Sequence, residues 1–153
     1  MSRYRDAFLF SALLSLLVLF CGFVCSQQQQ TVDFRSPDEN IARHIAQLRS
    51  REAVQKAAAA YWLGHHGMAA ERAIPALVEL LGDQTKIQVT KYRKPDAPES
   101  NKATVGEEAA TALVNIGKSS TDALIKTLIT SPEAHARENA AWALGALHRR
   151  QMI

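Results

Sequence analysis

Cysteine is almost absent from this sequence of 153 residues, and both cysteines, Cys21 and Cys25, lie close to the N-terminus. The rest of the chain therefore can form no disulfide bond. It also offers no thiol nucleophile and no cysteine ligand for zinc.

An excess of one charge is lacking as well, since 18 Lys and Arg residues stand against 15 Asp and Glu residues. A chain so close to neutral has no basic footprint for nucleic acid, and no nucleic-acid partner is expected. Phosphate-binding loops, spaced metal ligands and nucleophile motifs are also missing. The sequence thus predicts no catalytic residue, no cofactor and no metal site, and we expect a protein that is not an enzyme.

The N-terminal residues 1–26 have the pattern of an export signal. Arg3 and Arg5 precede a stretch from Ala7 to Val24 that carries no charge. Small residues before Gln27 suit cleavage, which would release a mature chain that starts there. The apolar stretch is long enough to approach a membrane span, so an uncleaved anchor formed by residues 7–25 is the alternative.

Lipidation is a weaker alternative, because a small residue should precede the modified cysteine, whereas Phe20 and Val24 precede the two cysteines. In either of the first two cases the arginines stay in the cytoplasm and the folded part is carried across. We therefore expect an exported protein, periplasmic or extracellular, that contacts the membrane only if the N-terminal segment is uncleaved.

After a polar spacer over residues 27–35, the chain repeats itself. Similar segments begin at Ala59, Ala109 and Ala140, about 50 and then about 30 residues apart, which is the spacing of helical arrays. In each segment the first, fourth, fifth and eighth places fall on one helical stripe. These stripes are Ala59-Trp62-Leu63-His66, Ala109-Ala112-Leu113-Ile116 and Ala140-Ala143-Leu144-Leu147.

Local signals predict where these helices begin and end. Capping boxes are predicted at Ser36–Glu39 and Thr104–Glu107, since each places a hydroxyl three residues before a glutamate. Gly67 and Gly117 should end their helices. Ser131-Pro132 should cap and start the third segment.

A second amphipathic helix should follow each of the first two segments. One starts near Ile74, where Pro75 suits a first turn, and the other carries Ala123, Leu124 and Leu128. A helix, a tight turn and an antiparallel helix, repeated and stacked, make an all-α structure of the solenoid type.

The phrases KAAAAYWLGHHGMAAERAIPALVELLGD (56–83) and RENAAWALGAL (137–147) resemble HEAT repeats, in particular the short bacterial type that also occurs in phycobilisome lyases. The resemblance covers about residues 38–149. It implies a short α-solenoid with a binding surface over residues 36–150. Repeats of this type serve chromophore lyases, DNA-repair solenoids and exported proteins alike, so the resemblance does not name a function.

The sequence departs from a regular array in two places. Residues 83–103 interrupt it with an inserted loop, in which the alternation from Lys86 to Arg93 predicts a short strand. The last helix also has no partner helix after it, and it could be a terminal cap or an assembly surface.

Several tempting residues have ordinary structural interpretations. His65 and His66 are adjacent and point about 100° apart on a helix, so a partly buried packing role for His66 is favoured over metal binding. Trp62 and Trp142 are expected in or beside the core, with Trp62 under the inserted loop. Glu107, next to Glu108, is taken up by its capping box.

We therefore expect a module that binds an unknown protein partner. The candidate surface consists of a ladder on the second helices and a basic part of the insert: Gln47, Glu79, Lys126, Lys91, Tyr92, Arg93 and Lys94. The alternative is an enzyme or a chromophore-handling protein of the bilin-lyase type.

Overall fold

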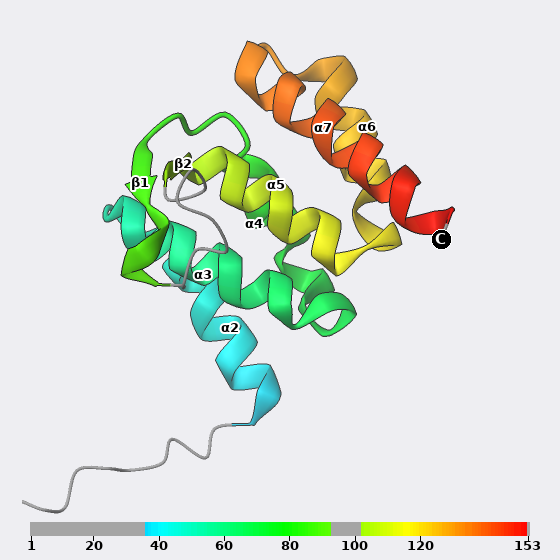
Figure 1. The fold of residues 1–153 in the computed structure, drawn as a ribbon. Coiled ribbons are helices and arrows are strands. Elements are labelled where there is room, and N and C mark those ends of the chain that lie inside the picture. The colour runs from blue at the N-terminus through cyan, green and yellow to red at the C-terminus, as the bar shows by residue number, and fades with distance from the viewer. Residues whose placement is uncertain (1–35, 93–101, 153) are drawn as a thin grey trace, which may run out of the picture. The chain divides into compact units, whose positions relative to one another are not determined.

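The helices of this protein stack in sequence order. The computed structural model describes residues 36–92 and 102–152, and residues 36–153 form one compact unit (Figure 1). The predicted signal or anchor and the polar spacer lie outside the described residues. Within the described ranges, no helix is both long and apolar enough to span a membrane.

The described α-helices are α2 (Pro37–Gln47), α3 (Ala53–His65), α4 (Ile74–Glu79), α5 (Val105–Ile116), α6 (Thr121–Thr130) and α7 (Ala134–Gln151). Helix α5 packs between α3 and α7, which makes one layer of the stack. Helices α4 and α6 contact each other and make the second layer, as Figure 1 shows. Short 3-10 turns, η1 (Gly67–Ala73) and η4 (Lys118–Ser120), connect the paired helices. The predicted all-α solenoid with one insert is confirmed.

Most of the predicted helix ends are confirmed. Both capping boxes form, with Ser36 and Thr104 each accepting a hydrogen bond from the backbone N–H of the glutamate three residues on. Gly67 (φ 54°) and Gly117 (φ 98°) follow the ends of α3 and α5 in backbone conformations that favour glycine.

The prediction that Ser131-Pro132 caps and starts α7 is wrong, because Ser131 is the extended residue that ends α6. Helix α7 begins at Ala134 instead. The Arg137 guanidinium donates to the carbonyls of Ser131 and Pro132, at 2.9 Å each. These contacts hold the two residues in a turn before the helix.

Most residues of the predicted stripes lie in the core. Leu63 and Leu113 are fully buried in the last turns of α3 and α5. A Cβ atom placed on Gly64 would lie 2.9 Å from the Cα atom of Ala112, closer than such atoms normally approach. The small residues therefore let α3 and α5 pack backbone against backbone.

The two ends of the insert pair with each other in a small antiparallel sheet. Strand β1 (Lys86–Gln88) pairs with β2 (Lys102–Thr104), with Lys86 opposite Thr104. The predicted strand is thus confirmed for its first three residues only, since a 3-10 turn, η2 (Val89–Lys91), follows. Ile87 packs with Ala57 and Val105 in a second apolar cluster.

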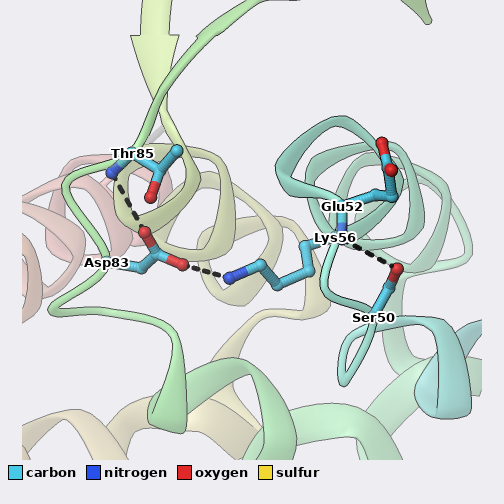
Figure 2. A network of polar contacts seen from close by, with 5 residues as sticks. All are labelled: Ser50, Glu52, Lys56, Asp83 and Thr85. Atoms are coloured by element: carbon cyan, nitrogen blue, oxygen red, sulfur yellow. Dashed lines mark hydrogen bonds and ion pairs between the residues drawn. The ribbon is translucent and has the colours of Figure 1, made fainter.

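An ion pair closes the base of the insert. Figure 2 shows Lys56 of α3 reaching Asp83, whose carboxylate also accepts the backbone N–H of Thr85 at 3.0 Å. Burial alone would raise the pKa of Asp83, but the hydrogen bonds from Lys56 and Thr85 outweigh it and hold that pKa below its ordinary value. The ion pair therefore fixes the start of the insert to α3.

Candidate functional site

A groove of about 490 Å³ runs between α4, α6 and the turn before α7. The residues of α6 that line it all lie on one face of that helix. Thr127 and Thr130 donate their hydroxyl protons to carbonyls four residues earlier in α6, at 2.9 and 2.8 Å. The groove is lined by Ile74, Pro75, Val78, Glu79, Gly82, Ala123, Lys126, Thr127, Thr130, Ser131, Pro132, Glu133 and Ala136.

Two of the three predicted ladder residues meet in this groove. Glu79 and Lys126 both line it, and both are exposed. Gln47, the last residue of α2, does not line it. The groove thus has an apolar lining with charges of both signs, which suits apolar side chains of a polypeptide more than a small charged ligand.

The predicted insert residues separate into two kinds. Lys91 is exposed, and Arg93 and Lys94 lie outside the described residues. Tyr92 instead turns inward: its hydroxyl donates to the Glu108 carboxylate at 3.0 Å, and its ring lies 5.8 Å from that of Tyr61. Tyr92 therefore holds the insert against α5 more than it presents a surface.

Glu108 is a buried carboxylate that the sequence interpretation missed. It is 2 % exposed, although it stands in the first turn of α5 beside the capping Glu107. Its place four residues before Ala112, on the face of the apolar stripe, was the available signal.

The three aromatic rings of His44, Trp62 and His66 form a stack beside the core. Their ring centroids are 3.9 Å apart for His44 and Trp62, and 3.5 Å apart for Trp62 and His66. Two imidazoles this close on one face of the indole would overlap, so they cover opposite faces.

The stack corrects two expectations. His66 is exposed and was expected to be partly buried. Trp62 does pack against the core as expected, but Tyr61 is the residue that lies beside the insert.

Trp142 was expected in or beside the core, and this prediction is wrong: it is 51 % exposed. It lies about 100° around α7 from the buried Ala143, which turns it out of the stack. With Glu107, Thr111, Glu138 and Asn139 it lines a cleft of about 390 Å³ between α5 and α7.

Comparison with known proteins identifies the repeat. A family model described as PBS lyase HEAT-like repeat matches residues 55–83, the segment that holds α3, η1 and α4. Residues 55–83 therefore form a HEAT-like repeat. No curated protein and no solved structure matches it. The matched HEAT repeat supplies the α4 wall of the groove, with Glu79, and both members of the Lys56–Asp83 pair.

In the described part of the chain, no group of three or more His, Cys, Asp or Glu side chains could hold a metal ion. The α4–α6 groove and the α5–α7 cleft are hollows that the stacking of the helices creates. Each lies between helices of successive repeats.

Proposed function

We propose that this chain is a non-enzymatic, extracytoplasmic HEAT-repeat module that binds a protein partner in the α4–α6 groove. The observation that carries the proposal is the groove itself, which is formed by helices of two successive repeats. It brings together Glu79 and Lys126. These two residues occupy matching places in successive repeats, so they belong to one continuous surface.

The proposed occupant is a polypeptide segment with apolar side chains and flanking charges. Ile74, Pro75 and Val78 offer apolar contact along α4, while Ala123 leaves room opposite them on α6. Burying such contacts would provide the affinity. The charges of Glu79 and Lys126 would then select the direction of the segment.

A photo-crosslinking amino acid placed on α6 tests this proposal. At Thr130, which lines the groove, it should form adducts with a protein of the native envelope. At Asp122, which is also exposed on α6 but does not line the groove, it should form few. Equal adducts at both positions, or none at either, would contradict groove binding.

The insert is the second part of the proposed surface. Replacing Lys91, Arg93 and Lys94 with alanine should reduce the yield of the Thr130 adduct and leave helicity unchanged. Tyr92 is kept in this variant, because its bond to buried Glu108 serves the fold. An undiminished yield would remove the insert from the surface.

The alternative, which the family's description suggests, is a chromophore-handling role. Incubation of the purified chain with a phycobilin and an acceptor protein, followed by denaturing electrophoresis, distinguishes the two. A covalent tetrapyrrole adduct that depends on the chain would favour the alternative. We expect no such adduct.

The extracytoplasmic location rests on the N-terminal pattern of residues 1–26. Mass measurement of the protein recovered from its native cell should give a chain that starts at Gln27. An intact N-terminus in a membrane fraction would point to the anchor, and an intact N-terminus in the cytoplasm would contradict export.

A further inference from the structure

The α5–α7 cleft combines an exposed aromatic ring with two carboxylates. Glu107 and Thr111 stand four residues apart on α5, and Glu138 and Trp142 stand four residues apart on α7. Residues at this spacing lie on one face of a helix, so each helix contributes one row of side chains to the cleft. Asn139 lies in the same hollow and anchors it, because its amide donates to the Leu81 carbonyl at 2.8 Å.

The carboxylates of this cleft keep acceptor capacity for a ligand. One oxygen of Glu107 accepts the Thr104 backbone N–H at 2.7 Å, and one oxygen of Glu138 lies 2.9 Å from the His135 ring. A carboxylate has about four lone-pair sites, so these contacts do not saturate either group. Glu138 is also largely exposed, with 69 % of its side chain open to solvent.

From this combination we propose that the α5–α7 cleft is a subsite for an arginine side chain of a polypeptide partner. A guanidinium group is planar, stacks on an indole face and donates up to five hydrogen bonds in a fixed fork. Trp142 supplies the face, with cation–π attraction, while Glu107 and Glu138 supply acceptors on the two sides.

Arg137 of α7 does not occupy the cleft, because its guanidinium is held by the carbonyls of Ser131 and Pro132. A free amino acid is a poorer fit than a peptide, because its α-carboxylate would be repelled by the two glutamates. The subsite is separate from the α4–α6 groove, so either proposal can fail without the other.

The chain contains two tryptophans, which makes the test direct. The full chain carries ¹⁵N only in its tryptophans, and its two indole N–H signals are followed during titration with acetyl-Gly-Arg-Gly-amide. A Trp142→Phe variant assigns the signals. We expect the Trp142 signal to shift with a millimolar Kd, while the signal of Trp62, enclosed by two imidazoles, stays still.

Two matched peptides isolate the chemistry. The citrulline peptide has the same shape without the charge, and the lysine peptide has the charge without the plane. We expect both to bind at least about fivefold more weakly than the arginine peptide. A citrulline or lysine peptide that binds as tightly as the arginine peptide would overturn the proposal, and so would a shift confined to Trp62 or no shift at all.

Two variants test the carboxylates. Glu138→Gln and Glu107→Gln should each weaken arginine binding by about threefold or more, and glutamine can still complete the capping box at Thr104. Glu71→Gln, an exposed change outside the cleft, should leave binding as it is. Circular dichroism confirms that all three variants are folded. Unchanged affinity in both cleft variants would overturn the proposal.

Discussion

Gly64 lies where α3 and α5 approach most closely. A Cβ atom at this position would lie 2.9 Å from the Cα atom of Ala112 and 3.2 Å from its Cβ atom. Backbone atoms cannot move aside as the end of a flexible side chain can. Gly64→Ala should therefore force the two helices apart and lower the free energy of unfolding by about 1–3 kcal/mol, measured by urea denaturation.

Gly145 provides the matched control for this change. It occupies the corresponding place in the third segment, but a Cβ atom there would meet only the Arg149 guanidinium, at 3.6 Å. Gly145→Ala should be neutral or stabilise the protein by up to about 1 kcal/mol, because alanine favours the helix. Equal losses for the two variants would contradict the role of close packing at Gly64.

His44 should make the stability of the protein depend on pH. Burial, the nearby Arg43 charge and His66 lower the pKa of His44 below its ordinary value of 6.5, although Gln47 opposes the shift. The unfolded chain then binds a proton more readily than the folded chain. The stability that neutral His44 contributes is complete above about pH 6.5 and is lost as the pH falls toward the folded pKa.

His44→Phe tests this dependence, because phenylalanine keeps a ring on Trp62 and cannot titrate. The loss of stability between about pH 8 and about pH 5 should be smaller in this variant than in the wild type. His148→Gln, an exposed change on α7, should lose as much as the wild type does. The same loss in all three proteins would show that His44 is not the group responsible.

The sequence predicted the inward-facing residues better than the outward-facing ones. The stripe placed Leu63 and Leu113 in the core, because helical spacing decides which side of its own helix a residue occupies. It misplaced His66, which is exposed, because this exposure depends on how far neighbouring helices extend over the residue. That extent is set by how whole helices pack, and it cannot be predicted from the spacing of residues within one helix.

At the scale of elements, one partly buried hydrogen bond between the insert and α5 can be tested. Tyr92→Phe removes the hydroxyl that donates to Glu108, a carboxylate that is 2 % exposed. A buried carboxylate that loses a donor is costly, so we expect a loss of about 1–3 kcal/mol in the free energy of unfolding.

Both residues also take part in other interactions, and a double-mutant cycle separates the bond from these. Tyr92→Phe, Glu108→Gln and the double variant should give a coupling energy of about 1 kcal/mol. A coupling energy near zero would mean that the Tyr92 hydroxyl does not hold the insert.

Element boundaries were predictable wherever their signals are local. A capping box needs only four consecutive residues, and both predicted boxes form. The start of α7 was misplaced because the carbonyls of Ser131 and Pro132 are taken by Arg137, which lies six and five residues further on. The pairing of β1 with β2 was not predicted at all, since it joins residues on opposite sides of the insert.

At the scale of the whole stack, stability should be highest in the middle. In a repeat array each unit gains its stability from its neighbours, and α5 has neighbours on both sides. Most of its residues are buried, whereas Ile41 is the one buried residue of α2. The same argument explains why the α4–α6 groove could not be predicted: it belongs to the stacking of repeats and to neither repeat alone.

Hydrogen exchange measured by mass spectrometry tests this gradient. The amides of α5 and of the facing half of α3 should exchange slowest, and those of α2 and the last turn of α7 fastest, because local opening needs less buried area to be exposed at the ends. Gly64→Ala should speed hydrogen exchange in α3 and α5 more than in α6 and α7, because it weakens the interface between α3 and α5. Equal protection from α2 to α7 would instead show that the repeats open as one cooperative unit.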